Sequence, residues 1–366
     1  MTHAPAPQAP PFCPNPACRF HRSDRHLWRF IRNGTYARMN PPFIIQRYQC
    51  VTCRRQFGDQ TFATTYWMRR PDLLAPVYMR LVACSGFRQI AREFRVSPQT
   101  IGRISGRLGR HGLLFHEMHR PGGKLTEPLS LDSFESFEWS QYYPTSFHVG
   151  VGQASHFFYG FTASELRRKG RMTDRQRAQR ARLEQRLGRP DPKAIEKDVA
   201  SLLRIVAARP QALELHTDEH QAYPRAVRRV PHLAVRHETI SSRAARTPSN
   251  PLFPINLLDL LLRHSGSNHK RETIAFSKRR QSALERMGIF IVWRNWMKPF
   301  SERKQDATPA MRLGIENHRL QVEEVLARRL FPSRVGLPQP WLDYYWARVP
   351  TRALARCVEH RRRYAM

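Results

Sequence analysis

Acidic residues are scarce in this 366-residue chain, which has 29 Asp and Glu residues against 62 Lys and Arg residues and a formal net charge of +33. A surface field this strongly positive attracts a polyanionic partner. The basic residues recur from the N-terminal region to the run Arg361, Arg362 and Arg363, so we expect an extended binding surface of the kind that a long duplex requires. An arginine-rich genome would raise the number of arginines without any ligand, but it would not explain the shortage of acids.

Long apolar runs are absent too, and cysteines are few. The most apolar stretch, residues 252–262, contains Asp259 and is too short to span a bilayer. Residues 1–12 are rich in proline and alanine but lack the apolar core of a signal peptide. Six cysteines in a chain of this length do not make a disulfide scaffold, and they indicate a reducing compartment. We therefore expect a cytoplasmic protein that has no membrane partner.

The chain divides into a Pro-rich arm and four sections with different sequence patterns. The arm is residues 1–12, which we expect to be disordered. The first section, residues 13–65, is aromatic and strand-like, and the second, 70–118, is helical. Strand and helix patterns alternate in the third, 125–310, and the fourth, 311–366, is basic and helical. Pro121 and Gly122 mark the joint between the second and third sections. The third section predicts an α/β domain.

The first section contains two close cysteine pairs, namely Cys13 and Cys18, and Cys50 and Cys53. Two thiolates from one tight turn occupy adjacent corners of a zinc tetrahedron, and a second turn supplies the other two. The 31 residues between the pairs contain Asn33 and Gly34, which we interpret as the turn of a hairpin. His21 could replace Cys18 as a ligand. We predict a structural Zn²⁺ ion in a zinc ribbon over residues 13–65.

Residues 87–107 have the pattern of two short helices joined by a tight turn. The apolar positions that such a unit buries are Ile90, Phe94, Val96, Ile101 and Ile104. Ser97 is a favoured N-cap and Pro98 a favoured first residue, so the second helix should start there. The residues on its outward face are Gln99, Thr100, Arg103 and Arg107. In a helix-turn-helix the first three would reach base edges in the major groove and the fourth would lie nearer the phosphates. The alternative is a helical hairpin inside a core.

Two carboxylates that follow apolar strand patterns, and a third on an expected helix, form a candidate catalytic site. Asp132 closes the sequence LSLD and Asp218 closes LELHTD, so we expect both at strand ends. Glu272 lies in SNHKRETIAFSKRR, which has helical character, and Arg279 seven residues later would share its face and hold a phosphate. Glu285 competes with Glu272 for the third position. Three such acids can hold two divalent ions.

A basic segment separates the first two acids. Residues 167–189 contain ten Lys or Arg residues against only Asp174 and Glu184, in a sequence of helix formers. We predict a basic helix there, and a merely solvated helix face is the alternative.

The order of zinc ribbon, helix-turn-helix and three acids resembles the bacterial insertion-sequence transposases of the DDE type, which are relatives of the retroviral integrases. The segments that carry the resemblance are DSFESFEWSQYYP, ELRRKGRMTDRQR, HTDEHQAYP and HKRETIAFSKRR, with WRNWMKP beyond. The family's three acids map onto Asp132, Asp218 and Glu272, and its basic residue onto Arg279. The long gap between the first two acids departs from compact members, and we attribute it to a basic helical insertion at 167–189.

The resemblance implies a ribonuclease H-like catalytic domain over residues 125–310, with a mixed sheet flanked by helices. It implies a transposase that binds the terminal inverted repeats of an insertion sequence, cuts DNA with two Mg²⁺ or Mn²⁺ ions and transfers the 3′-hydroxyl to target DNA. The partner would be double-stranded DNA, bound by a homodimer or higher oligomer at the bacterial nucleoid. The alternatives are a transcription regulator or inactive relative that binds DNA without cutting, and a nuclease that only hydrolyses.

Overall fold

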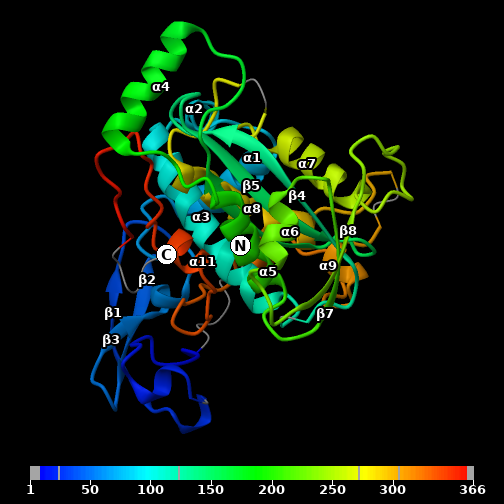
Figure 1. Ribbon diagram of the computed structural model, residues 1–366. Coiled ribbons are helices and arrows are strands. Elements are labelled where there is room, and N and C mark those ends of the chain that lie inside the picture. Colours follow the sequence, from blue (N-terminus) through cyan, green and yellow to red (C-terminus); the bar gives the residue numbers. More distant parts are fainter. Residues whose placement is uncertain (1–8, 24, 123, 271–272, 304–305, 361–366) are drawn as a thin grey trace.

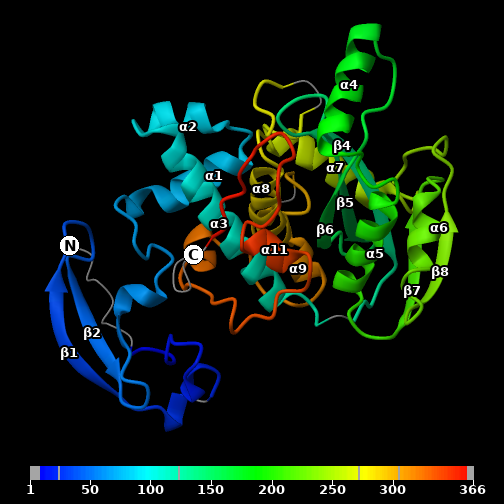
Figure 2. The same ribbon diagram turned by 60° about the vertical axis from the view of Figure 1, so that its left-hand side comes forward.

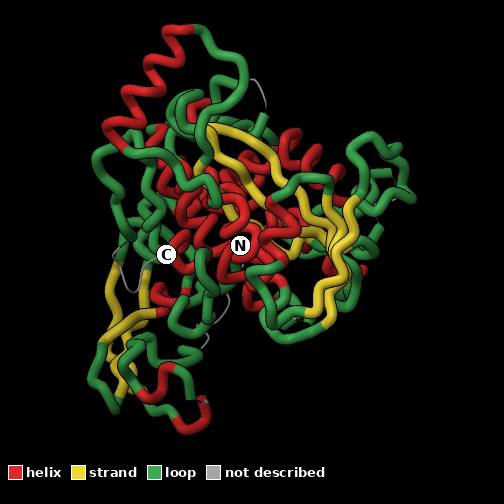
Figure 3. The backbone as a smooth tube through the Cα atoms, viewed as in Figure 1, coloured by secondary structure: helices red, strands yellow, loops and turns green. Residues whose placement is uncertain are grey.

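The structure is a computed structural model with two separate sheets (Figure 3). It describes residues 9–23, 25–122, 124–270, 273–303 and 306–360. A small sheet lies at one end of the molecule, a larger sheet at the other, and a group of helices between them (Figures 1 and 2). Most of the N-terminal arm lies outside the described residues, but Phe12 is buried and its ring packs edge-on against those of Phe62 and Phe331.

The small sheet is antiparallel and has the order β1-β2-β3. Its strands are β1 (Phe30–Ala37), β2 (Ile44–Cys50) and β3 (Gln56–Gly58). The prediction of a hairpin turn at Asn33 and Gly34 was wrong, because both residues lie inside β1, where the register with β2 shifts between Arg32 and Thr35. Gly34 has a φ of +67°, so the chain uses its conformational freedom for a β-bulge. The turn itself lies farther on, at residues 38–43.

The central helices include the two of the expected helix-turn-helix. The central helices are α1 (Leu74–Val82), α2 (Phe87–Glu93), α3 (Pro98–His119) and α8 (Arg280–Val292). The expected pair is α2 and the start of α3. Ser97 caps α3 as expected, since its Oγ accepts a hydrogen bond from the N–H of Thr100 over 3.2 Å. However, α3 is 22 residues long, and its second half is buried against α8, where a side chain at Gly109 or Gly112 would collide with the α8 backbone. The recognition helix is therefore continuous with the core of the larger domain.

The larger sheet is mixed and has the order β6-β5-β4-β7-β8. Its strands are β4 (Leu129–Phe137), β5 (Pro144–Gly152), β6 (Phe158–Glu165), β7 (Ala212–Thr217) and β8 (Ala234–Thr239). β4, β5 and β6 form an antiparallel meander, whereas β7 pairs in parallel with both β4 and β8. This mixed α/β architecture is compatible with the expected ribonuclease H-like fold.

Helices cover both faces of the larger sheet (Figure 1). They are α5 (Ala194–Val206), α6 (Ala222–Val227) and α7 (Phe253–Ser265), whereas α4 (Asp174–Leu187) projects away from the body. Leu129 lies on the α5 face, and the next residue, Ser130, points the other way and donates to the carbonyl of Pro251 just before α7. No described helix has the length and hydrophobicity to cross a membrane.

The C-terminal section is less helical than we predicted. Its described part contains only the short helices α9 (Pro309–Arg312), α10 (Val322–Val325) and α11 (Trp341–Tyr345). The rest is irregular chain that connects the other parts. Thr64 Oγ1 donates to the carbonyl of Leu326 over 2.7 Å, and Trp341 Nε1 donates to that of Phe161 over 2.9 Å. The segment is thus held by contacts with the rest of the molecule and not by its own helical propensity.

Candidate active site and metal centre

Asp132 and Asp218 lie on neighbouring parallel strands at the same level of the larger sheet. Ser130 of β4 pairs with His216 of β7, and Asp132 and Asp218 each follow two residues later, close enough for the charge of Asp218 to act on Asp132. Since residues two apart in a strand share a face, Asp132 lies on the same face as Ser130, which is the α7 face. The prediction that Asp132 ends its strand was wrong, because β4 continues to Phe137; Asp218 does follow β7 directly.

The environment of Asp132 disfavours its ionised form. Burial and the charge of Asp218 raise the pKa of Asp132 to about 6, although the backbone N–H of Ser133 donates to its Oδ1 over 2.6 Å. The charge of Arg246 also lowers this pKa. A buried carboxylate with a second acid beside it is typical of sites that bind divalent cations through oxygen.

Helix α7 contributes a third carboxylate, Asp259. Burial and the charge of Asp132 raise the pKa of Asp259 to about 8, and Arg263, one turn later on the helix, opposes the effect. Asp259 Oδ1 is buried without a hydrogen-bond partner among the described residues. Because buried polar atoms are nearly always satisfied, this orphaned oxygen fits a site completed by a cation. The sequence offered one signal that we did not use, an acid inside an otherwise apolar helical stretch.

The three carboxylates are spread more widely than the ligands of a single ion would be. In the described part of the chain, their ligand atoms do not form a group within 4.8 Å of one another, unlike those of the four cysteines. Two-metal sites hold ions about 3.5–4 Å apart, so the surrounding carboxylates enclose a larger space. The ligand atoms of Asp132, Asp218 and Asp259 are therefore less compact than those of the four cysteines.

Glu272 lies outside the described residues, and the described residues on either side of it, 268–270 and 273–279, do not form the helix that we predicted from about Asn268. Residues 273–279 are turns and bends, and α8 begins at Arg280. Arg279 is the exposed N-cap of α8, so it does not stand two helical turns along one helix from Glu272. Asn268 is buried and donates to Ser277 Oγ over 3.1 Å, a tertiary contact that replaces helical pairing.

Glu285, the competitor for the third position, serves the packing of helices. It lies on α8 beside Gly106 of α3. Its Oε1 is 3.9 Å from Arg110 Nη1 and accepts a hydrogen bond from Gln281 over 3.2 Å. Burial raises the pKa of Glu285, and these partners oppose the rise. Glu285 is thus a buried structural acid between two helices.

A chain of buried polar side chains crosses the sheet behind Asp132. Its links are Tyr223 OH to Ser133 Oγ at 3.1 Å, Ser133 Oγ to His148 Nδ1 at 2.6 Å, His148 Nε2 to Ser164 Oγ at 2.7 Å, and Ser164 Oγ to Asp198 Oδ2 at 2.6 Å. Burial lowers the pKa of His148 to about 3, so its ring is neutral and carries one proton. Because Ser164 donates to Asp198, the ring donates to Ser164 and accepts from Ser133. Tyr223 OH also lies 3.4 Å from Asp132 Oδ1. This series of hydrogen bonds therefore fixes the tyrosine hydroxyl that contacts the Asp132 carboxylate.

The neutral ring of His148 predicts a pH-dependent mutational cost. The unfolded chain protonates this histidine near pH 6.5, whereas the folded chain does not until about pH 3, so its contribution to stability is lost as the pH falls below 6.5. We expect His148→Asn to lower the free energy of unfolding by about 2 kcal/mol at pH 7.5 through the broken hydrogen-bond chain, and by almost nothing at pH 5. Urea unfolding at both pH values measures the difference. Val149→Ala is the control, and an equal cost of His148→Asn at both pH values would contradict the assignment.

The four cysteines of the N-terminal section gather in one place, with all four sulfurs within 4.8 Å of one another. Cys13 and Cys53 sulfurs are 3.6 Å apart, and those of Cys18 and Cys50 are 4.0 Å apart. Zinc–sulfur bonds of about 2.3 Å place tetrahedral sulfurs about 3.8 Å apart, so the cluster fits a zinc ion without rearrangement.

Contacts around the cluster decide between Cys18 and His21 as the fourth ligand. His21 Nδ1 is 2.8 Å from the carbonyl of Cys13, and its Nε2 is 2.7 Å from Ser333 Oγ, so both ring nitrogens are engaged elsewhere. Burial acts to raise the pKa of Cys50, but hydrogen bonds from the Cys53 backbone and the Trp28 indole outweigh it and lower the pKa to about 7. The donor set is therefore four cysteines.

The predicted DNA-contacting residues of α3 divide into two groups. Gln99 and Arg103 are exposed near its N-terminus, and Thr100 is partly exposed beside them. Arg107 is partly buried, and its Nη1 donates to the carbonyl of Thr64 over 2.9 Å, which ties α3 to the chain that follows the zinc ribbon. The first three side chains are thus accessible to solvent, while Arg107 has an internal partner.

A second compact group of metal-ligating side chains was missed at the sequence level. His216 Nε2 lies 3.5 Å from Glu214 Oε1 and 3.2 Å from Glu238 Oε2, all on β7 and β8. The opposite ring nitrogen is 2.7 Å from Gln153 Nε2. The histidine is fully engaged by these neighbours, so the group is explained as a partly exposed cluster of polar side chains close to Asp218.

Comparisons with known proteins give little. No protein-family model and no curated protein matches the chain. Among solved structures, the chain is similar to one in the cryo-EM structure of a simian T-cell lymphotropic virus intasome in complex with PP2A regulatory subunit B56 gamma. The identity is 15%, the TM-score is 0.27, and the match covers 67% of this chain and 74% of the other. A similarity this low establishes no shared activity.

Proposed function

We propose that this protein is a DNA transposase of the DDE type, which binds the terminal inverted repeats of an insertion sequence, cuts a strand and transfers the 3′-hydroxyl. The observation that carries the proposal is a group of three acids in a chain of net charge +33: the charge of Asp218 acts on Asp132, the charge of Asp132 acts on Asp259, and Asp259 Oδ1 has no hydrogen-bond partner among the described residues. Acids concentrated at one point of a strongly basic protein fit a metal-dependent site that acts on a polyanion.

In this proposal, Asp132 and Asp218 hold the divalent ions through their oxygens. Divalent ions held by these oxygens would supply an activated water or hydroxyl for the attack and would stabilise the charge of the leaving oxygen. The rigid sheet fixes both carboxylates, and the exposed Arg246, whose charge reaches Asp132, holds the scissile phosphate beside them. The zinc ribbon and the exposed start of α3 recognise the element ends. Joining two ends requires at least a homodimer on DNA.

The third carboxylate has two candidates. The resemblance assigns Glu272, which lies outside the described residues. The geometry favours Asp259, because its charge already acts on that of Asp132 and its Oδ1 has no donor. Asparagine at 259 and glutamine at 272 keep the shape of each side chain and remove its charge, so the two variants separate the candidates.

We expect the purified protein to cleave duplexes that carry the inverted repeats flanking its gene when Mg²⁺ is present and not when EDTA is added. Asp259→Asn should reduce the rate about 10²- to 10³-fold, since removing one charged group from a transition-state site typically costs that much, and Glu272→Gln should leave it nearly unchanged. Strand cleavage and joining are followed on labelled duplexes in denaturing gels.

Several outcomes of this experiment would change the assignment. Loss of cleavage only with Glu272→Gln would return the third position to Glu272. Specific binding of the repeats by wild-type protein without cleavage by any divalent ion would favour the regulator or inactive relative, because the ribbon and the helix-turn-helix would act in the same way in both. Cleavage without joining would indicate a nuclease.

A further inference from the structure

Helix α4 projects from the body and buries none of its residues (Figures 1 and 2). Thr173 caps its start, where the Thr173 side chain and Gln176 form a reciprocal capping box. A 14-residue helix without a single buried residue receives little stabilisation from a core. We call residues 167–189 the α4 arm.

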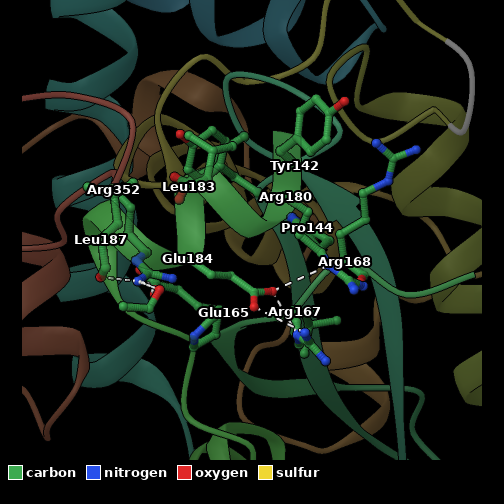
Figure 4. Close-up of a pocket in the computed structure, with 15 residues that line it drawn as sticks. Tyr142, Pro144, Glu165, Arg167, Arg168, Arg180, Leu183, Glu184, Leu187 and Arg352 are labelled. Carbon is green, nitrogen blue, oxygen red and sulfur yellow. Dashed lines mark hydrogen bonds and ion pairs between the residues drawn. The ribbon is translucent and has the colours of Figure 1, made fainter. Parts of the chain in front are cut away.

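The base of the α4 arm is held by ion pairs (Figure 4). Glu184 accepts from Arg167 at 2.7 Å and Arg189 at 3.0 Å, and Arg180 lies at 3.5 Å. Arg352, from the C-terminal segment, donates to the carbonyls at the end of α4. These contacts set the direction of the arm and neutralise Glu184, which leaves Asp174 as its one exposed acid.

The outer part of the α4 arm is a surface of basic side chains. The exposed Lys and Arg residues of the arm are Lys169, Arg171, Arg175, Arg177, Arg182, Arg186 and Arg189. Arg175, Arg182 and Arg186 are spaced by seven and four residues, so they lie along one side of the helix. None of the described residues forms a hydrogen bond or ion pair with their side chains. Arg175 and Arg182, with Tyr142, line an open hollow beside the helix.

This arrangement differs from an ordinary solvated helix face. Solvated faces usually pair unlike charges at i and i+4, whereas Arg182 and Arg186 are like charges at that spacing, which destabilises an isolated helix. A row of three arginines over eleven residues is about 16 Å long at 1.5 Å per residue. That length matches about five base-pair steps of duplex at 3.4 Å each.

The arm lies at the end of the sheet toward which β4 runs from the carboxylates. Five residues of β4 separate Asp132 from Phe137, about 17 Å at 3.4 Å per residue. The loop that follows carries Tyr142, whose ring lies 4.8 Å from the guanidinium of Arg168 at the arm's base. Helix α2 of the helix-turn-helix is also at this upper end of the molecule in both views (Figures 1 and 2).

We propose that the α4 arm binds the phosphate backbone of duplex DNA, on the stretch next to the phosphate that the carboxylate site holds. The contacting residues are Arg175, Arg182 and Arg186. The inference rests on the proposed function for the identity of the polyanion. The contacts are to phosphates, so they add affinity without sequence preference and orient the duplex between the helix-turn-helix and the active site.

The test compares DNA binding of the triple variant R175Q/R182Q/R186Q with that of a matched variant, R209Q/R236Q/R328Q, which removes three exposed arginines on other elements. Binding to a duplex with the element end is measured in EDTA at several salt concentrations, which separates it from cleavage. Three lost phosphate contacts should reduce the slope of log affinity against log salt by about 2 to 3 and weaken binding at least about tenfold at 150 mM salt.

Each result supports or overturns the proposal. A salt slope of R175Q/R182Q/R186Q equal to that of the matched variant overturns it, and a larger loss of slope than in the matched variant supports it. Because α4 buries no side chain and glutamine is a good helix former, circular dichroism should show both variants folded. If wild-type protein does not cleave DNA but the slope difference is present, the arm proposal stands and the transposase proposal fails. If wild-type protein cleaves DNA but the two variants have the same salt slope, the transposase proposal stands and the arm proposal fails.

Discussion

Asp132→Asn is expected to reduce Mg²⁺-dependent DNA cleavage about 10³-fold while leaving the affinity for the duplex unchanged. Asparagine keeps the size of the side chain and the hydrogen bond from Ser133 to its Oδ1, so the sheet should fold normally. It removes the charge that faces Asp218 and holds the cations, and bound metal contributes several kcal/mol to such transition states. Since each 1.4 kcal/mol is tenfold in rate, a loss of about 4 kcal/mol gives this figure.

The control for this experiment is Glu135→Gln on the same strand. Glu135 is exposed and lies three positions after Asp132 on β4. Because side chains alternate between the two faces of a strand, it points to the opposite face from Asp132, so its charge does not enter the site. Asp218→Asn should behave as Asp132→Asn does. Cleavage by Asp132→Asn at the wild-type rate, with Glu135→Gln also active, would remove the carboxylates from the mechanism.

Removal of zinc is expected to unfold residues 13–65 while the larger sheet stays folded. The apolar cluster around the four sulfurs is small, and its buried members are Cys13, Cys18, Phe20, Trp28, Tyr48, Cys50 and Phe57. A core of this size cannot hold a domain by itself. Structural zinc contributes about 10–16 kcal/mol of apparent binding free energy in comparable small domains, and that energy becomes folding energy.

The measurement is zinc content together with thermal unfolding. We expect one zinc per chain in the wild type, no stoichiometric zinc in Cys18→Ser or Cys50→Ser, and full zinc in His21→Gln, because the ring of His21 bonds to Cys13 and Ser333 and not to the cluster. Cys84→Ser is the control, since Cys84 lies outside the four-cysteine group. A chelator-treated protein that keeps the ordered environment of Trp28 would contradict the structural role of the metal.

The parts that local patterns specify were predictable from the sequence. Ser97 and Pro98 start α3 because an N-cap and a first-turn proline act within a few residues. The paired cysteines converge because each pair lies in one tight turn. Asp218 follows its strand as expected, since LELHT is short and apolar and a helix begins soon after it.

The parts that failed depend on distant contacts. Gly34 is a turn residue by composition, but the pairing of β1 with β2 uses its positive φ for a bulge. The residues after Asn268 have helical propensity, yet Asn268 itself is buried in a contact with Ser277. The apolar stretch containing Asp259 was treated only as a run too short for a membrane, so its role as a helix over the sheet was missed.

Composition and local pattern alone therefore determined that the chain is strongly basic, that two close cysteine pairs lie in its first section, that a capped helix starts at Pro98, and that Asp132 and Asp218 lie in or directly after apolar strands. Tertiary structure alone decided which residues share a site. The parallel pairing of β4 with β7 brings Asp132 near Asp218, and the path of α7 across the sheet brings Asp259 near Asp132. The physical reason is that propensity and capping act over a few residues, whereas the meeting of carboxylates more than forty positions apart is set by strand register and packing.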